Sequence, residues 1–227
     1  MKVAIHQPEY WPIPRLLAKW RAADLLILMD NAQFDRESFQ HRAKMRKAAG
    51  GGRAFDYLTI PYLHVGTPQQ IRVLEPSEPG WADKHWQQVK NWYRGCDDAR
   101  LREVSYWFRR VASQDDSIGN YAWASMAWLA GMIHLDTPIV PASALVAPPD
   151  GWGSRGAWVL RLCQAVRAKT YLSGRSGAQY LDFHAFERSG IAVEVQAYSQ
   201  DREDLSGLHE YLTEGPEHLA YMTRRQP

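Results

Sequence analysis

The order of the first thirty residues constrains the fold of this chain more than any other feature. Lys2 to Ile5 is a short apolar run, the polar string 6–12 follows at once, a helical pattern covers about 15–23, and a second apolar run, 24–29, ends on Asp30. This order of strand, polar turn, helix and strand is typical of a parallel βαβ unit, whose strands end at the same edge of a sheet. We therefore expect the polar side chains that follow the two strands to lie in one crevice.

Several of these polar side chains are candidates for chemistry. His6 exchanges a proton near neutral pH, so it can act as a general base toward an amine or hydroxyl, worth about 10² to 10⁴-fold in rate, or donate to a phosphate. Gln7 offers a donor and an acceptor for substrate orientation. Asp30 can orient His6, bind an ammonium group or hold magnesium, and its alternative role is a helix or turn cap. Tyr10 either stacks on a substrate ring or packs in the core.

The rest of the chain alternates between strand and helix patterns. A basic, irregular segment over 36–53 ends in three glycines, which favour a loop. Further strands are expected at Phe55–Pro61, Gln70–Leu74, Pro138–Ser143, Thr170–Leu172 and Ile191–Val195. Helices are expected at 81–93, 97–112, 117–132, 178–187 and 205–212, and after Ser154, an expected N-cap that follows a turn-rich linker at 147–153. The pattern predicts an α/β fold, with a Rossmann-like, mainly parallel sheet and a helical insertion in the middle of the chain.

Alternating cations within the basic segment suggest a binding face. Arg42, Lys44 and Arg46 are two residues apart, so in an extended chain they point to the same side. A guanidinium binds phosphate or carboxylate through two parallel hydrogen bonds, and such a cluster suits a diphosphate. The alternative is a solvated charged face.

Composition excludes several classes of protein. A chain of 227 residues is long enough for a full core, and a formal charge of +2 does not predict nucleic-acid binding. Two cysteines indicate no disulfide framework, and neither Cys-x-x-Cys nor His-Glu-x-x-His is present, so no metal site is predicted. The first residues lack a signal-peptide pattern, and the most apolar window, 121–133, is too short to span a bilayer. We expect a cytoplasmic protein that binds neither membrane nor nucleic acid.

A set of motifs spread over most of the chain resembles the WbqC-like family. The matching residues are His6-Gln7-Pro8-x-Tyr10-x-Pro12, Lys19, Ala23-Asp24-x-x-Ile27-x-x-Asp30, Gln33-Phe34, Ser38-Phe39-Gln40-x-Arg42, Leu58-Thr59-Ile60-Pro61, Trp81-x-x-Lys84-His85, Tyr93 and Thr170-Tyr171-Leu172-Ser173-Gly174. The resemblance implies a single domain over 1–227, with sheet-forming parts at about 1–75 and 138–215 and a helical part at about 81–133. Family members often lie in polysaccharide or secondary-metabolite gene clusters, and attachment of glycine to an amino sugar has been suggested for some. The resemblance thus implies a biosynthetic enzyme.

The matching positions extend the candidate site. Lys19 joins His6 and Asp30 as a candidate catalytic residue, where it neutralises a phosphate or instead caps a helix end. Gln33, Lys84 and His85 are candidate substrate-binding residues, although Lys84 and His85 equally suit a surface cation beside a packed aromatic side chain. Ser173 and Gly174 follow a strand, where backbone N–H groups can reach an anionic ligand.

Three functions remain open on this evidence. The first is acyl or aminoacyl (glycyl-type) transfer, or condensation, onto an amine of an amino sugar or small metabolite. The second is an ATP-dependent adenylating or nucleotidylyltransferase-like ligase, which would need ATP and Mg²⁺. The third is a non-catalytic sugar- or metabolite-binding module. The expected partner is a small anionic molecule (a nucleotide sugar, ATP or an amino-acid derivative), and the cofactor requirement and oligomeric state stay open.

Overall fold

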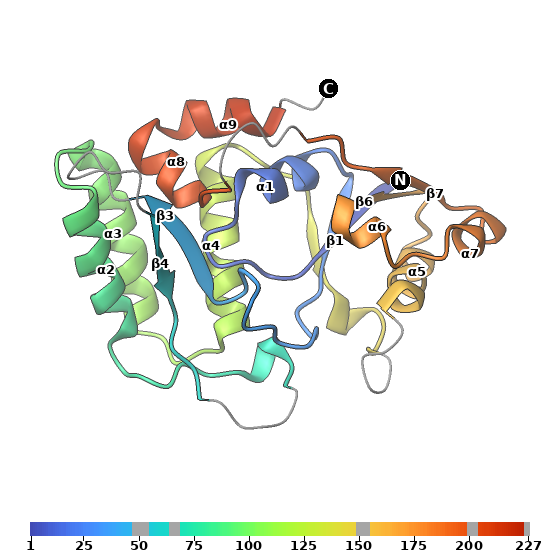
Figure 1. Cartoon of the computed structure of the whole chain (residues 1–227), viewed down its shortest axis with the longest axis horizontal. Coiled ribbons are helices and arrows are strands. Elements are labelled where there is room, and N and C mark those ends of the chain that lie inside the picture. The colour runs from blue at the N-terminus through green and yellow to red at the C-terminus, as the bar shows by residue number, and fades with distance from the viewer. Residues whose placement is uncertain (47–54, 64–68, 149–154, 199–203, 225–227) are drawn as a thin grey trace.

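The computed structural model describes residues 1–46, 55–63, 69–148, 155–198 and 204–224 (Figure 1). The strands are β1 (Lys2–His6), β2 (Leu25–Leu28), β3 (Arg42–Arg46), β4 (Phe55–Thr59), β5 (Ile139–Pro141), β6 (Thr170–Ser173) and β7 (Ala192–Val195). The α-helices are α1 (Pro14–Arg21), α2 (Trp81–Trp92), α3 (Asp98–Ala112), α4 (Ile118–Met132), α5 (Arg155–Ala165), α6 (Arg175–Ala178), α7 (Phe183–Arg188), α8 (Gly207–Thr213) and α9 (Pro216–Arg224). Two 3₁₀ turns, η1 (Ile71–Val73) and η2 (Ala142–Ala144), complete the set.

A parallel sheet forms the centre of the fold and confirms the predicted class. Its described strands lie in the order β5-β2-β1-β6-β7, and each neighbouring pair is parallel. In chain order the strands are the third, second, first, fourth and fifth, which matches five of the six strands of the doubly wound nucleotide-binding order 3-2-1-4-5-6. The order reverses between β1 and β6, which are paired through Lys2 and Thr170. Ligands of open parallel sheets bind beyond the carboxyl ends of the strands at such a reversal.

Alternation along the central strands separates two hydrophobic cores. Ala4 and Leu26 belong to a large cluster with residues of α1 and α4, whereas Val3, Ile5 and Ile27 belong to a smaller one with residues of α5 and α7. Successive side chains of a strand point to opposite faces, so β1 and β2 are buried on both. This explains the continuous apolar runs Val3–Ile5 in β1 and Leu25–Leu28 in β2.

One strand within the basic segment and the strand that follows the segment form a separate sheet, which corrects the sequence interpretation. Residues 42–46 were expected to be irregular but form β3, which pairs antiparallel with β4. The strand expected at Phe55–Pro61 therefore lies outside the main sheet, since its hydrogen bonds go to β3. The prediction of a strand at Gln70–Leu74 is also wrong, because Gln70 makes only an isolated bridge to Gln33 before the turn η1.

The helical insertion is confirmed, whereas the last part of the chain contains more and shorter helices than its sequence pattern predicted. Helices α2, α3 and α4 match the predicted spans closely. The helix expected at 178–187 is two short helices, because the Asp182 side chain accepts from the Ala185 amide and starts α7 anew. A further helix, α9, follows α8 beyond Gly215, whose φ of 95° ends α8. The three glycines, most of the expected linker and the proposed N-cap Ser154 lie outside the described residues.

Close packing at Gly207 leads to a first prediction. A Cβ added at Gly207 would lie 2.8 Å from the Pro12 carbonyl oxygen and 2.9 Å from a Leu129 methyl group. We expect Gly207→Ala to lower the free energy of unfolding by about 1–3 kcal/mol, measured by urea denaturation. Gly131→Ala in α4 is the matched control, because a Cβ there meets no atom within 4 Å. It should gain up to about 1 kcal/mol through helix propensity, and equal effects of the two variants would contradict the argument.

Candidate functional site

A crevice lies at the carboxyl ends of β1 and β6, where the strand order reverses. It has two lobes, a larger one of about 610 Å³ and a smaller one of about 420 Å³. Four residues line both lobes and so form their junction: His6, Lys19, Gly174 and Ser176. Three of these four come from the sequence candidates, although those candidates were widely separated along the chain.

The two lobes differ in chemistry. The larger lobe is lined mainly by aromatic side chains and two amides, with one acid and one arginine: Phe34, Trp158, Tyr171, Tyr180, Gln7, Gln33, Asp35 and Arg36. The smaller lobe is lined by an acid, two arginines and polar groups: Glu9, Arg15, Arg175, Gln179, Gln196 and Tyr198. Apolar surface with a few placed polar groups is typical of small-molecule sites. The larger lobe suits a ring, and the smaller lobe suits a charged ligand.

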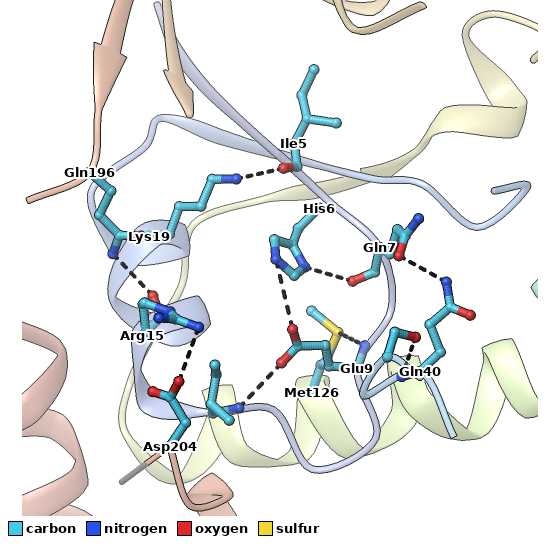
Figure 2. Close-up of polar contacts among 12 residues, drawn as sticks. Ile5, His6, Gln7, Glu9, Arg15, Lys19, Gln40, Met126, Gln196 and Asp204 are labelled. Carbon is cyan, nitrogen blue, oxygen red and sulfur yellow. Dashed lines mark hydrogen bonds and ion pairs between the residues drawn. The ribbon is translucent and has the colours of Figure 1, made fainter. Parts of the chain in front are cut away.

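His6 ends β1, and its ring lies between the Gln7 carbonyl group and the Glu9 carboxyl group (Figure 2). Its Nδ1 lies 2.9 Å from the Gln7 carbonyl oxygen, which can only accept, so Nδ1 carries the hydrogen. The Nε2 lone pair therefore faces Glu9, whose Oε1 is 3.8 Å away. Burial lowers the pKa of His6 to about 3, and the positive charge of Lys19 adds to the effect. With this pKa the ring is neutral at neutral pH and its Nε2 is a hydrogen-bond acceptor and a weak base, so the role of His6 as general base stays a prediction.

Glu9 is the titrating acid of the crevice, and the sequence interpretation did not include it. Its side chain is buried, and Oε2 accepts a long hydrogen bond of 3.4 Å from the Ile13 amide. Burial raises the pKa of Glu9 from 4.5 to about 7. A carboxyl group with this pKa can take up and release a proton near neutral pH. The available signal was its place in the polar string after β1, between Gln7 and Trp11.

Lys19 brings a positive charge to the junction from the last turn of α1. The side chain is 4% exposed, and Nζ donates to the carbonyl oxygen of Ile5 at 2.7 Å. Burial lowers the pKa of Lys19 to about 8, with the Glu9 carboxylate opposing that shift. The ammonium has three hydrogens and gives one to Ile5, so it retains donors for an anionic group of a ligand.

The polar string that carries His6 and Glu9 is held by α4 and by the segment before β3. The Glu9 amide lies 3.4 Å from Met126 Sδ, and the Trp11 amide donates to Ser125 Oγ at 2.8 Å. The Gln7 side chain accepts from Gln40 Nε2 at 2.9 Å. These contacts span more than a hundred residues of sequence for α4, so the geometry of the string depends on the helical insertion.

The wall of the smaller lobe is closed by contacts that the sequence did not predict. Arg15 forms an ion pair of 3.2 Å with Asp204, and its carbonyl oxygen accepts from Gln196 Nε2 at 3.1 Å (Figure 2). Gln196 follows β7 in the sequence, and Asp204 precedes α8. The two segments thus meet over the first turn of α1 and border the lobe.

Asp30 is not brought together with His6. Both of its carboxylate oxygens accept from Ser143, Oδ1 from the amide at 2.9 Å and Oδ2 from the hydroxyl at 2.5 Å. It lines neither lobe of the crevice. The geometry corresponds to the capping alternative, since Asp30 ties the end of β2 to the turn η2 after β5.

Tyr10 and His85 are core residues rather than contacts for a ligand. The Tyr10 hydroxyl lies 2.9 Å from His85 Nδ1, and His85 Nε2 lies 3.0 Å from the carbonyl oxygen of Thr59. Because the Thr59 carbonyl must accept, Nε2 carries the hydrogen and Tyr10 donates to Nδ1. Both side chains are buried, and neither lines the crevice. They connect the polar string to α2 and to the end of β4.

The predicted cation face exists but lies on the β3–β4 hairpin, away from the crevice. Arg42, Lys44 and Arg46 occupy the half-buried positions of β3, in alternation with buried ones. The guanidinium of Arg42 donates to the carbonyl oxygen of Glu37 and lies over the ring of Tyr57. None of the three lines either lobe, because β3 is not part of the main sheet. Lys84 is also outside, exposed and paired with Glu78 at 2.6 Å.

Ser173 and Gly174 have different places at the end of β6. Ser173 is fully buried, and its hydroxyl donates to the carbonyl oxygen of Gly174 at 3.0 Å, so it does not line the crevice. Gly174 lines both lobes, and a Cβ there would meet no atom within 4 Å. Gly174 is therefore the place where the junction could be narrowed without disturbing the packing.

Two further observations concern metals and membranes. Within the described ranges, no three His, Cys, Asp or Glu side chains are grouped so that they could hold a metal ion. Across the same ranges, no helix combines the length and the apolar character that a membrane crossing requires.

The fold and the crevice together define an α/β protein with a candidate ligand site at the reversal point of a parallel sheet. The model of the WbqC-like protein family matches residues 7–204, and the chain belongs to this family. A search of curated proteins and a search of solved structures each found no significant match to the chain.

Proposed function

We propose that the chain is a biosynthetic enzyme that transfers an acyl or aminoacyl group to an amine, with the two-lobed crevice as its active site. The observation that carries this proposal is that Glu9, neutral His6 and the Lys19 ammonium all line the smaller lobe, with His6 and Lys19 at its junction with the larger one. An acid that titrates near pH 7 beside a retained positive charge suits a reaction that removes a proton and develops an oxyanion.

Glu9, Lys19 and His6 would each act in a different step of such a transfer. Glu9 takes a proton from the ammonium of the acceptor, and the nitrogen lone pair then forms a bond to the acyl carbon of the donor. The bond between that carbon and the leaving oxygen breaks, its electron pair stays on the oxygen near Lys19, and the second nitrogen proton leaves to solvent. His6 Nε2 faces Glu9 Oε1 at 3.8 Å, so a small movement of either side chain lets it accept a hydrogen bond from the protonated carboxyl group between the two proton transfers.

The strand order favours one alternative, a ligase that first adenylates its acid with ATP. The crevice occupies the position at which doubly wound folds bind nucleotides, and its larger lobe is lined by aromatic rings. In that case the larger lobe would hold a nucleotide and the donor would be an acyl adenylate. The acceptor half of the reaction would be unchanged.

A ligand screen followed by product detection tests the proposal. Thermal unfolding is measured with ATP, ADP and nucleotide sugars, each with and without Mg²⁺, since a ligand at 100 times its Kd stabilises the native state by about 2.7 kcal/mol. Stabilising ligands are then incubated with a panel of amines together with carboxylic acids or their activated esters, and amide products are sought by mass spectrometry. Product from a free acid that requires ATP and Mg²⁺ favours the ligase, and product from an activated ester without ATP favours direct transfer.

A substitution at the junction tests whether product formation takes place in the crevice. Gly174→Val should abolish product formation while leaving the melting temperature within a few degrees, because its side chain enters open space between the lobes. Stabilisation by a ligand without any product would instead favour a binding module. Product formation unaffected by Gly174→Val would place the reaction outside the crevice.

A further inference from the structure

The smaller lobe combines one buried acid with cations, and this pattern specifies a ligand. Glu9 lies at the inner end near His6, and Arg175 and Arg15 lie on the walls. Resting on the proposed transfer, we propose that this lobe is the acceptor site and that the acceptor is a compact zwitterion, with a primary amine for Glu9 and an oxyanion (carboxylate or phosphate) for Arg175.

The acid has acceptor capacity that the protein does not use. Its Oε1 faces His6 Nε2 at 3.8 Å, beyond hydrogen-bond distance, and its Oε2 receives one long hydrogen bond from Ile13. Among the residues that the structure describes, no lysine or arginine forms an ion pair with Glu9. The charges of Arg15 and Lys19 favour the ionised form of Glu9, but burial of a side chain that is 7% exposed outweighs them, so ionisation stays costly without a directly paired cation. The ammonium group of a ligand supplies both the charge and the donors.

The arginine that remains for an oxyanion is Arg175. Arg15 already pairs with Asp204 at 3.2 Å and uses its carbonyl oxygen to accept from Gln196. Arg175 lines the same lobe and has no ion-pair partner within the described ranges. A planar guanidinium binds a carboxylate or phosphate through two parallel hydrogen bonds. Amine and oxyanion must therefore be close together in the ligand, since both partners line one lobe of about 420 Å³.

The position of the acid also orients the acceptor toward its donor. Glu9 and His6 lie beside the junction, so an amine held by Glu9 would face the larger lobe past Lys19 and Gly174. The aromatic lining of the larger lobe suits an acyl donor that contains a ring. The two ligands would thus meet at the residues that line both lobes.

Titration calorimetry on the full chain tests the acceptor site without requiring turnover. The probes are β-alanine and O-phosphoethanolamine, which carry both groups, and ethylamine and propionate, which carry one each. We expect at least one zwitterion to bind tenfold or more tightly than either half, and the tighter of the two identifies a carboxylate or a phosphate. Zwitterions that bind no more tightly than ethylamine or propionate would overturn the proposal.

Matched variants assign the two ends of the ligand. Arg175→Gln and Glu9→Gln should each raise the Kd of the zwitterion by about tenfold to a hundredfold, the usual worth of a hydrogen bond to a charged group. Arg188→Gln, an exposed arginine in the last turn of α7, should leave it unchanged. An unchanged Kd in Arg175→Gln would overturn the assignment of the oxyanion.

The outcomes separate this inference from the proposed transfer. If the zwitterion binds as described and no donor yields an amide, the acceptor site stands and the proposed transfer fails. If amide forms with an amine that carries no anionic group while zwitterions do not bind, the proposed transfer stands and the inference about the acceptor fails.

Discussion

Replacement of Glu9 by glutamine is expected to reduce turnover by about 10² to 10⁴-fold while the protein remains folded. The amide has nearly the shape of the carboxyl group but cannot take a proton from the acceptor amine. The rate of the native enzyme should rise through about pH 7 as Glu9 ionises, and this rise should be absent in the variant. Steady-state kinetics over pH 5 to 9, with the donor and acceptor found in the ligand screen, checks both points.

The same substitution has a signature in stability that does not depend on the substrate. Because the pKa of Glu9 is higher in the folded state, at about 7, than its ordinary 4.5, the folded protein binds the extra proton between these values. The native protein therefore loses stability as pH rises through this window, and Glu9→Gln does not suffer this loss. The free energy of unfolding of the variant, relative to the native protein, should increase from pH 4.5 to pH 7, by at most on the order of 3 kcal/mol.

An exposed carboxylate provides the control for both measurements. Glu187→Gln in α7 removes a side chain that is 82% exposed and lies outside the crevice. It should change neither the rate nor the pH dependence of stability. Turnover within threefold of the native rate in a folded Glu9→Gln variant would exclude Glu9 as the general base.

Replacement of Trp11 by alanine is expected to lower the free energy of unfolding by about 3–5 kcal/mol. The indole is 1% exposed, and its ring centroid lies 4.4 Å from that of Trp107 in α3 and 5.6 Å from that of Trp128 in α4. Its removal leaves a large cavity where the polar string meets the helical insertion. Urea denaturation monitored by circular dichroism measures the loss.

A second substitution at the same position tests the backbone. Trp11 has a φ of 50°, in the left-handed region that disfavours a side chain. Trp11→Gly should therefore be at least as stable as Trp11→Ala, although glycine removes one more carbon. Tyr106→Ala, in which a side chain that is 65% exposed is shortened, should change stability by less than about 0.5 kcal/mol. A loss below 1 kcal/mol in Trp11→Ala would show that the cluster does not hold the string.

The predicted site shows where sequence interpretation succeeds and where it stops. His6 and Gly174 were identified because each follows an apolar strand, and parallel strands must end at one edge. Glu9 was not identified, because its altered pKa arises from burial against segments such as α4, whose Met126 is 117 residues away. Asp30 follows β2 at the same edge, as expected, but its carboxylate bonds to Ser143, and no local sequence pattern identifies that partner.

The cations of β3 show the same limit of sequence interpretation. The alternation of Arg42, Lys44 and Arg46 correctly indicated a common side of an extended chain. It could not indicate which sheet that chain would join, because strand pairing is decided by contacts with residues such as Tyr57 and Leu58 in β4. The roles of Arg42, Lys44 and Arg46 as ligand contacts stay predictions, and they lack support because none of the three lines the crevice.

The sequence by itself determined the parallel βαβ core, the helical insertion and the polar ends of β1 and β6, because period, apolar runs and turn residues act over short distances. The tertiary structure alone decided which polar groups face one another and which are buried. Burial and neighbouring charge set the proton affinities of Glu9, His6 and Lys19, and both depend on segments that are distant in the chain. The chemistry of the crevice is for this reason a property of the assembled fold.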